Sequence, residues 1–261
     1  MINVAVAGAA GRLGTLIVKN VVENTTTHLV QAFDIQCVDE DVGESAGIGR
    51  TGVKVTEASS IDETLDADVL IDFTAPDAAL RNIEAASKKG IPVVMGTTGF
   101  SEEQKKQIED YCQKIPAVIS PNFSVGVNVF WKIIEYATKF LGDYDIEILE
   151  KHHKFKKDAP SGTAIRVAEV ASSILKEQGK DRRIVYERSG ERKDDEITVL
   201  ALRGGNVAGE HTVHYFGMGE KIEITHAAGS RQAFAGGAIT AANWVVDKSP
   251  GLYSMNDVLD F

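Results

Sequence analysis

The sequence of 261 residues has only two cysteines, Cys37 and Cys112. Two cysteines build neither a disulfide framework nor a four-cysteine metal site, and so few cysteines fit a reducing cytosol. No apolar run approaches the roughly 18 residues that a membrane helix needs. The first residues also lack the basic stretch and cleavage pattern of a signal peptide. We therefore expect a soluble cytoplasmic protein with no membrane partner.

An excess of positive charge is absent as well. The chain has 28 Lys and Arg against 38 Asp and Glu, which gives a formal net charge of −10. Nucleic acids and anionic membranes are bound through basic surfaces, so neither is expected as the main partner. With 43% hydrophobic residues the chain can bury an ordinary core. Its length fits one large or two modest domains.

The first half of the chain alternates short apolar runs with segments of helical spacing. The apolar runs cover residues 2–7, 29–33, 69–73, 92–95 and 117–119. Continuous apolar strands that alternate with helices predict a parallel sheet covered on both faces. We expect an α/β fold over residues 1–123, a Rossmann-type doubly wound parallel sheet that forms the dinucleotide-binding domain.

The second half has a different pattern. Apolar and polar residues alternate over 144–148, 197–200, 212–215 and 221–225, which predicts strands with one wet face in a mixed or antiparallel sheet. We expect a smaller α+β domain over residues 124–233 that binds the substrate, with an exposed charged loop at 180–196. A helical pattern returns near residue 231, and the final helix, about 234–261, is expected to pack back on the first domain.

A glycine turn follows the first apolar run and opens a helical segment. Its residues are Gly8, Ala9, Ala10, Gly11, Arg12, Leu13 and Gly14, a G-x-x-G-x-x-G pattern that departs by one residue from G-x-G-x-x-G. Small residues let a pyrophosphate approach the backbone, and the helix N-terminus offers free N–H groups. Asp34, 26 residues after Gly8, ends the next strand and can bind ribose hydroxyls. A plain tight turn is the alternative, but strand, helix and acid together favour a dinucleotide site.

The residues after Asp34 bear on the choice of coenzyme. Ile35 and Gln36 follow it, and neither is basic. A 2′-phosphate needs a nearby cation and is repelled by an acid, so NADH is expected to be preferred over NADPH. Two further loops lie where such a sheet places ligands, although each could be an ordinary loop. They are Gly96, Thr97, Thr98 and Gly99 after one strand, and Ser120, Pro121, Asn122 and Phe123 after the next.

Positive charge is concentrated in residues 151–157, KHHKFKK. The segment carries +4 without its histidines, which leaves −14 for the rest of the chain. The turn at 158–163 and an amphipathic run at 165–175 follow, which predicts a helix start with Ser161 as a capping residue. Free N–H groups there can hold a carboxylate, and a histidine can exchange a proton near neutral pH. The segment therefore suits an anionic substrate.

Three other interpretations of the segment compete with this one. The lysines can form a solvated face with incidental histidines. The pair His152 and His153 can bind a metal, but adjacent strand residues point to opposite faces and nearby lysines repel a cation, so no metal is expected. Ser161 can be a nucleophile, although the surrounding sequence is not G-x-S-x-G.

The segment closely resembles the signature of the 4-hydroxy-tetrahydrodipicolinate reductases, formerly called dihydrodipicolinate reductases. That signature reads E-[IV]-x-E-x-H-x-x-x-K-x-D-x-P-S-G-T-A. The chain matches it without departure through Glu147, Ile148, Glu150, His152, Lys156, Asp158, Pro160, Ser161, Gly162, Thr163 and Ala164. The resemblance extends to the glycine turn, to residues 71–74 with Pro76, and to the loops at 96–99 and 120–123, so it spans nearly the whole chain.

The resemblance implies an activity and a set of site residues. The family reduces a cyclic imine dicarboxylate with NADH or NADPH in the diaminopimelate route to lysine. By position, His152 would be the acid–base residue and Lys156 the proton donor, while His153, Gly162 and Thr163 would bind substrate. The cofactor would be bound by residues 8–13, Asp34, 96–98 and 120–123. Members are usually homotetramers joined through the second domain, and many have a basic residue where this chain has Ile35.

Other classes remain as alternatives to this function. The nearest is another two-domain nicotinamide-dependent oxidoreductase that acts on a small dicarboxylate. A short-chain dehydrogenase would need Tyr-x-x-x-Lys, which none of the six tyrosines provides. A phosphorylating semialdehyde dehydrogenase would need a nucleophilic cysteine, and neither cysteine is well placed for that role. A nucleotide-sensing regulator would keep the glycine turn but has no use for the His-His-x-x-Lys segment.

Overall fold

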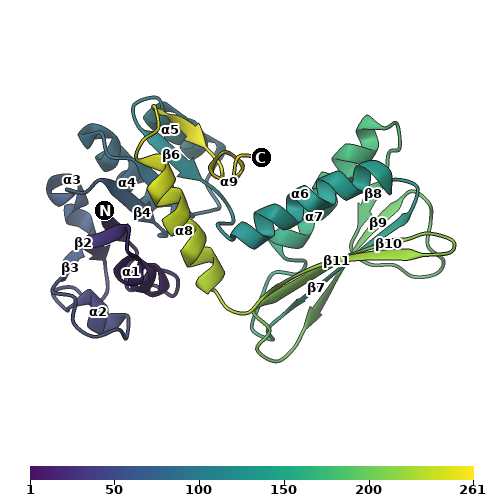
Figure 1. The fold of residues 1–261 in the computed structure, drawn as a ribbon, viewed down its shortest axis with the longest axis horizontal. Coiled ribbons are helices and arrows are strands. Elements are labelled where there is room, and N and C mark those ends of the chain that lie inside the picture. The colour runs from purple at the N-terminus through teal and green to yellow at the C-terminus, as the bar shows by residue number, and fades with distance from the viewer. The chain divides into compact units, whose positions relative to one another are not determined.

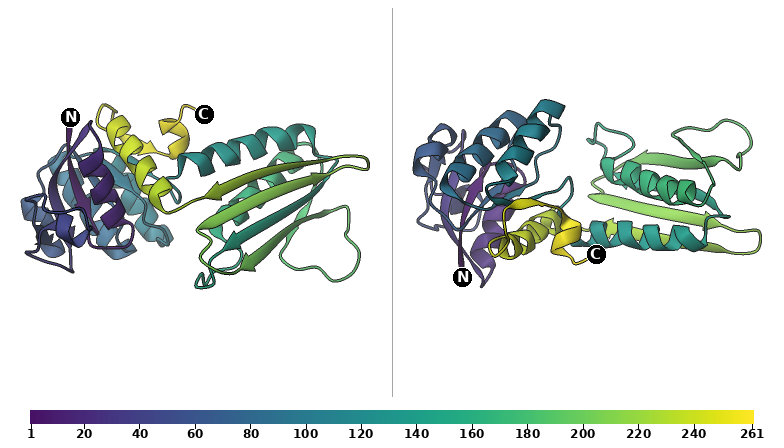
Figure 2. Two further views of the ribbon diagram at one scale, coloured as in Figure 1. Left: turned by 60° about the horizontal axis from the view of Figure 1, so that its bottom comes forward. Right: turned by 90° about the horizontal axis from the view of Figure 1, so that it is seen from above.

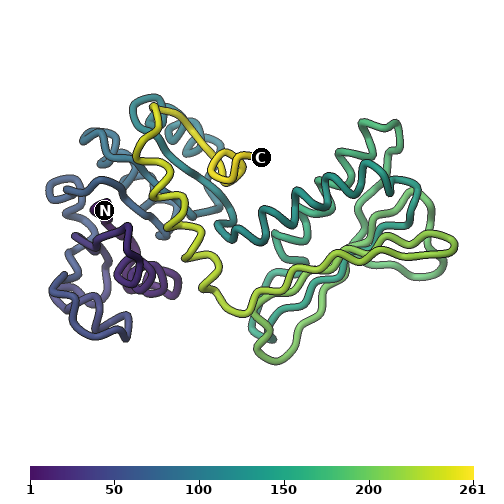
Figure 3. The backbone as a smooth tube through the Cα atoms, viewed as in Figure 1, coloured from purple at the N-terminus to yellow at the C-terminus, as the bar shows by residue number.

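The computed structural model describes residues 1–261, which form two compact units. Unit 1 comprises Met1–Val125 and Gln232–Phe261, and unit 2 comprises Gly126–Arg231. The tube in Figure 3 follows the chain from the first segment of unit 1 into unit 2, and then back into unit 1 through α8 (Gln232–Val245). Unit 1 is therefore built from both ends of the described chain. No helix in the structure is both long enough and apolar enough to cross a membrane.

Unit 1 contains a seven-stranded parallel sheet with the order β12-β6-β5-β4-β1-β2-β3. Its strands are β1 (Ile2–Ala7), β2 (Thr27–Asp34), β3 (Val55–Glu57), β4 (Val69–Asp72), β5 (Val93–Met95), β6 (Pro116–Ile119) and β12 (Gly251–Tyr253). Strand β1 pairs with β2 on one side and with β4 on the other, so the winding reverses there. Ligands of doubly wound sheets bind beyond the strand ends at such a point. The expected Rossmann-type sheet is confirmed.

Helices cover both faces of this sheet (Figure 1). One face packs on α1 (Gly14–Glu23), α2 (Val42–Ser45), α8 and α9 (Met255–Val258), and the other on α3 (Ile61–Thr64), α4 (Pro76–Lys89) and α5 (Glu102–Cys112). A short 3-10 turn, η1 (Ala58–Ser60), precedes α3. Alternate residues of β1 serve the two cores: Val4 and Val6 face α1 and α8, whereas Ala5 and Ala7 belong to the opposite core.

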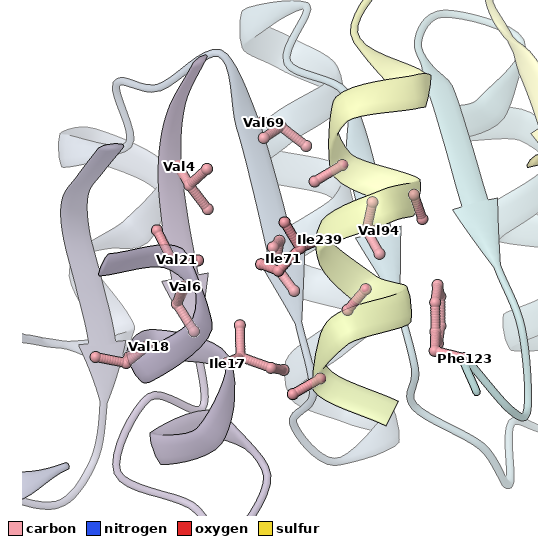
Figure 4. Packing of buried hydrophobic residues seen from close by; sticks show 14 of the residues in the cluster. Val4, Val6, Ile17, Val18, Val21, Val69, Ile71, Val94, Phe123 and Ile239 are labelled. Carbon is pink, nitrogen blue, oxygen red and sulfur yellow. The ribbon is translucent and has the colours of Figure 1, made fainter. Parts of the chain in front are cut away.

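The helix α1 shows why this region folds as the sequence predicts. Ile17, Val18 and Val21 are fully buried on its inner face, beside Val6 of β1 (Figure 4). Burial of each such side chain contributes about 1.5–3 kcal/mol. Ile239 of α8 lies in the same cluster, so this core includes residues from both segments of unit 1.

The expected final helix over about 234–261 is wrong in its C-terminal half. Helix α8 ends at Val245, residues 251–253 form the edge strand β12, and only 255–258 are helical again. Pro250 lacks an N–H group and disfavours the helical conformation in the residue before it. The next residue, Gly251, donates its N–H to the carbonyl of Ile115, which starts the pairing of β12 with β6.

Unit 2 is a mixed five-stranded sheet with the order β11-β10-β7-β9-β8. Its strands are β7 (Asp145–His152), β8 (Arg183–Val185), β9 (Glu196–Arg203), β10 (Gly209–Phe216) and β11 (Lys221–Ala228). Strand β7 is parallel to β9 and antiparallel to β10. Two helices, α6 (Val125–Phe140) and α7 (Gly162–Glu177), lie on one face of the sheet (Figure 2). The expected mixed sheet is confirmed, although the loop expected at 180–196 contains the short edge strand β8.

The core of unit 2 lies between this sheet and its two helices. Ile146 and Ile148 alternate with partly exposed residues along β7, and they pack with Val213 of β10, Val167 of α7 and Ile134 of α6. The opposite face of the sheet has no helix on it (Figure 2). The alternation expected for one wet face is therefore present in β7.

Candidate active site

The glycine turn connects β1 to α1 in a conformation that requires glycine. Gly8 has a φ of 79°, a region that L side chains rarely adopt. A Cβ added to Gly14 would lie 1.8 Å from the carbonyl oxygen of Gly8, and one added to Gly8 would lie 3.0 Å from the carbonyl oxygen of Phe73. The backbone of the turn is thus packed tightly against itself and against the end of β4.

The turn presents free hydrogen-bond donors at the start of α1. The N–H groups of Arg12, Leu13 and Gly14 have no hydrogen-bond partner within the chain, whereas Gly11 and Thr15 donate to backbone carbonyls. These three donors lie at the positive end of the dipole of a ten-residue helix. Anionic phosphates bind at such helix ends, so the turn fits the pyrophosphate of a dinucleotide.

Asp34 lies beside the turn at the end of β2. One oxygen of its carboxylate accepts a hydrogen bond from the N–H of Ala10 at 2.9 Å, and the other accepts one from the N–H of Gln36 at 3.0 Å. Each carboxylate oxygen has a second lone pair that can accept from a ribose hydroxyl. Ile35 follows with 75% of its surface exposed. The acid is therefore held where the fingerprint of dinucleotide sites places it.

The other two predicted loops of unit 1 meet at the phenylalanine that follows β4. A Cβ added to Gly96 would lie 2.0 Å from the ring of Phe73, so this loop needs a glycine to pass the ring. Phe73 also contacts Phe123 edge-to-face, with ring centroids 5.5 Å apart. Thr97 and Ser120 help to line one cavity of about 650 Å³ beside these loops. The glycine turn and both loops thus share one edge of the sheet.

The buried carboxyl group of Asp72 lies at this edge. Asp72 accepts hydrogen bonds from the N–H and hydroxyl of Thr74 and from the side-chain amide of Asn82, at 2.6–2.9 Å, and a longer one from Thr97. Complete burial raises the pKa of Asp72, although these donors act in the opposite direction. Asp72 therefore connects the end of β4 to the loop at 96–99.

In unit 2, His152 ends the strand β7 and lies beside a buried carboxylate. Its Nδ1 atom is 2.5 Å from Oε2 of Glu150. The Nε2 atom has no hydrogen-bond partner within the chain, and a Cβ added to Gly209 of the neighbouring strand would lie 3.0 Å from it. The imidazole is held through one nitrogen, which leaves the other to exchange a proton.

Glu150 has no exposed surface, and all its partners are hydrogen-bond donors. Arg203 donates to both carboxylate oxygens at 2.7 and 2.8 Å, and the N–H of Ser161 donates at 2.9 Å. Burial raises the pKa of Glu150, but the hydrogen bonds from His152, Arg203 and Ser161 outweigh it and lower that pKa to about 2. Glu150 is therefore a carboxylate at neutral pH.

The lysine of the segment lies in the loop after β7. Nζ of Lys156 donates to both oxygens of Asp158 at 2.7 and 2.8 Å, and these hydrogen bonds lower the pKa of Asp158. The N–H of His153 donates to the carbonyl of Val207 at 2.8 Å, while its buried Nδ1 atom has no partner. Both predicted residues are thus held close to the end of β7.

The N-terminus of α7 completes this group of residues. Ser161 caps the helix by accepting a hydrogen bond from the N–H of Ala164, and its hydroxyl lies 2.9 Å from Nε2 of His211. The N–H of Gly162 has no partner in the chain, and a Cβ added to Gly162 would meet no atom within 4 Å. Thr163 belongs to the same first turn. The open helix end suits a carboxylate ligand.

Four residues of the site have no role predicted from the sequence. Asp72 ends β4 and Phe73 follows it, just as the predicted loops follow their strands, so their position in the sequence could have marked them as site residues. Arg203 and His211 lie 53 and 50 residues after their partners Glu150 and Ser161. No local pattern connects residues so far apart. The predicted cofactor residues all lie in unit 1, and the predicted catalytic and substrate residues all lie in unit 2.

The fold places the chain among the two-domain proteins of the Rossmann type. The family model described as dihydrodipicolinate reductase, N-terminus, matches residues 2–123, and the one described as dihydrodipicolinate reductase, C-terminus, matches residues 126–259. These two models together cover nearly the whole chain. The chain belongs to the dihydrodipicolinate reductase family.

Similar proteins extend over the full length of the chain. It is 52% identical to the 4-hydroxy-tetrahydrodipicolinate reductase of Archaeoglobus fulgidus, over 98% of this chain and 99% of that protein. The corresponding reductase of Methanocaldococcus jannaschii is 48% identical over 99% and 97%. The solved structure of dipicolinate-bound dihydrodipicolinate reductase from Paenisporosarcina sp. TG-14 has a TM-score of 0.78, 26% identity and 97% coverage of both chains.

Proposed function

We propose that the chain is an NAD(P)H-dependent 4-hydroxy-tetrahydrodipicolinate reductase of the diaminopimelate route to lysine. The reaction consumes the hydroxylated cyclic imine, NAD(P)H and a proton, and yields tetrahydrodipicolinate, NAD(P)⁺ and water. The observation that carries the proposal is the group formed by His152, Lys156 and the open N-terminus of α7, in a chain that matches both halves of the family. This group combines proton exchange with binding of a carboxylate.

The residues of unit 1 fit the dinucleotide. The free N–H groups of residues 12–14 would hold the pyrophosphate, and Asp34 would accept hydrogen bonds from the adenine ribose. Loops 96–98 and 120–123 would hold the nicotinamide half, because they lie at the same edge of the sheet. A bound nicotinamide supplies the hydride of the reaction.

The residues of unit 2 fit a small dicarboxylate. Gly162 and Thr163 would bind one carboxylate at the helix N-terminus, and His153 would contribute a further contact. Hydride addition leaves an electron pair on the conjugated ring system, so a proton must be delivered to complete the reduction. Lys156 would donate that proton, and Nε2 of His152 would act as the acid–base group.

The coenzyme preference follows from two adjacent residues. We propose that NADH is used in preference to NADPH, because the carboxylate of Asp34 repels a 2′-phosphate and Ile35 offers no compensating cation. Ile35 instead exposes an apolar surface beside the ribose position.

The open face of the unit 2 sheet supports the proposal of a homotetramer. Leu200, Leu202 and Phe216 are each more than a third exposed on β9 and β10, and a hollow of about 390 Å³ includes Leu200 and Phe216. Apolar surfaces of this kind mark interaction sites, and soluble oligomers are mostly symmetric assemblies of one chain. Sedimentation of the purified protein measures the assembly state directly.

A coupled assay tests the function. The substrate is generated in situ by dihydrodipicolinate synthase, and the oxidation of NADH and of NADPH is followed by absorbance. Turnover is expected with both coenzymes, faster at low concentration with NADH, and none when the synthase is omitted. If neither NADH nor NADPH supported turnover, the proposed function would be overturned.

A further inference from the structure

We infer that Glu150 and Arg203 act as a positioning pair for the reaction, a role that rests on the proposed function. The pair connects three pieces of unit 2 that the mechanism needs together. These pieces are the imidazole of His152, the loop that carries Lys156 and the N-terminus of α7. Neither residue is assigned to touch the substrate.

The carboxylate of Glu150 is fully engaged. Its Oε2 atom contacts Nδ1 of His152 and Nη1 of Arg203, and its Oε1 atom accepts from Nη2 of Arg203 and from the N–H of Ser161. A buried carboxylate with this many donors keeps its geometry, because each lost contact would leave a buried polar group unsatisfied. Glu150 therefore fixes His152 and the start of α7 relative to each other.

Arg203 extends this arrangement to the lysine loop. Arg203 lies on β9, in register with His152 of the neighbouring parallel strand β7, and its Nη2 atom also donates to the carbonyl of Asp158 at 2.6 Å. Asp158 in turn holds the ammonium of Lys156 through its side chain. One guanidinium thus connects the buried carboxylate to the loop that carries the proton donor. A planar fork with several donors suits this task better than a lysine ammonium does.

The pair also defines the proton position on His152. A carboxylate accepts hydrogen bonds, so Nδ1 of His152 carries a proton and Nε2 is the site of exchange. On the other side of the ring, Gly209 leaves space that a Cβ would take, at 3.0 Å from Nε2. The imidazole is therefore held by Glu150 on one edge and keeps free space at the other.

Two variants test this role against a matched control. Glu150→Gln removes the negative charge at constant shape, and Glu150→Asp keeps the charge but shortens the side chain. The control is Glu196→Gln, since Glu196 is buried at the opposite end of β9 and pairs with Arg183 at 2.5 Å. We expect kcat to fall at least 100-fold in Glu150→Gln and less in Glu150→Asp. The Kd for NADH, measured by fluorescence, should stay within twofold, and Glu196→Gln should keep its kcat within twofold.

Nitrogen NMR of ¹⁵N-histidine-labelled protein provides a readout that a loss of stability would not produce. His152 should show the Nδ1–H tautomer in the wild-type chain and a mixture of tautomers in the folded Glu150→Ala variant. The inference is overturned if kcat of Glu150→Gln stays within threefold of wild type, or if wild-type His152 carries its neutral-form proton on Nε2. An Nδ1–H tautomer in a wild-type protein without turnover would instead overturn the proposed function.

Discussion

The N–H of Ala10 donates to the carboxylate of Asp34 at 2.9 Å, which ties the glycine turn to the end of β2. The residue proposed to bind ribose therefore also supports the turn proposed to bind pyrophosphate. Ile35 follows Asp34 and is 75% exposed. A change at residue 35 can consequently alter coenzyme choice without disturbing this hydrogen bond.

The first prediction concerns coenzyme choice. Ile35→Arg places a cation beside the 2′ position, so the ratio of kcat/KM for NADPH to that for NADH should rise about tenfold or more, which is roughly 1.4 kcal/mol. Val22→Arg is the control, because Val22 is also an exposed apolar residue of unit 1 and lies on α1. Steady-state rates with both coenzymes measure the ratio. An unchanged ratio in Ile35→Arg would exclude residue 35 as the determinant.

The second prediction concerns proton transfer. His152→Gln and Lys156→Met should each lower kcat by about 10²–10⁴-fold, the usual contribution of a general acid or base, with little change in the Kd for NADH. Lys176→Met removes an exposed lysine from the far end of α7 and should leave kcat unchanged. Fluorescence titration with NADH and steady-state kinetics separate the two quantities. A variant of Lys156 that only weakened NADH binding would contradict its assignment as the proton donor.

The third prediction concerns pH. Burial, and then the neighbouring charge of His152, lower the pKa of His211 to about 4 from its ordinary value of 6.5. The unfolded chain binds this proton near pH 6.5 and the folded chain only near pH 4, so the stabilisation is complete above pH 6.5 and is lost as the pH falls towards 4. Between pH 7 and pH 5 the free energy of unfolding should therefore fall by about 2 kcal/mol.

Urea unfolding at the two pH values measures this loss in unit 2. In a Trp244→Phe background the fluorescence of Trp131 reports on unit 2 alone. His211→Gln should reduce the pH dependence, and the part that remains is expected from His226, whose pKa burial also lowers. His28→Gln, at an exposed position of unit 1, should leave the dependence unchanged. Glu150 cannot produce the same effect, because its pKa near 2 places its loss of stabilisation below pH 4.5. If the free energy of unfolding changed equally with pH in wild type and in His211→Gln, His211 would not be the source of the pH dependence.

The fourth prediction compares two adjacent glycines of α8. A Cβ added to Gly237 would lie 1.6 Å from the carbonyl oxygen of Phe123, but one added to Gly236 would meet nothing within 4 Å. Gly237→Ala should therefore lower the free energy of unfolding by about 1–3 kcal/mol and weaken NADH binding, because it displaces the loop at 120–123. Gly236→Ala should raise it by about 0.5–1 kcal/mol through helix propensity. Thermal unfolding and NADH titration of both variants check the contrast.

Much of unit 1 was predictable because its signals are local. The apolar run at 2–7, the glycine turn and the helical spacing of Ile17 and Val21 are neighbours in sequence, and they form β1, the turn and α1. Short strands were missed for the opposite reason. β3 and β12 have three residues each, and their pairing with β2 and β6 supplies what their own sequence does not specify.

In the candidate site, too, the features that depend on neighbouring residues were predictable and the contacts between distant residues were not. Ser161 was expected to cap a helix, and it accepts a hydrogen bond from the N–H of Ala164 as the local pattern implies. The contacts that hold the site rigid are not local: Arg203 reaches Glu150 across β9 and β7, and His211 reaches Ser161 from β10. The helix α6 was also not expected, because its Val, Ile and aromatic residues favour strands as much as helices. Only the packing of Phe130 and Ile134 on the sheet of unit 2 decides between them.

The division of unit 1 between two segments has a consequence for synthesis. A ribosome releases residues 1–125 first, then the continuous unit 2, and only afterwards the residues of α8 and β12. Unit 2 has all its strands and its core available before unit 1 does. The apolar face of the parallel sheet that α8 covers must therefore stay uncovered while about a hundred further residues are translated. The nascent chain is most exposed to aggregation in that interval, and its last segment ends that exposure.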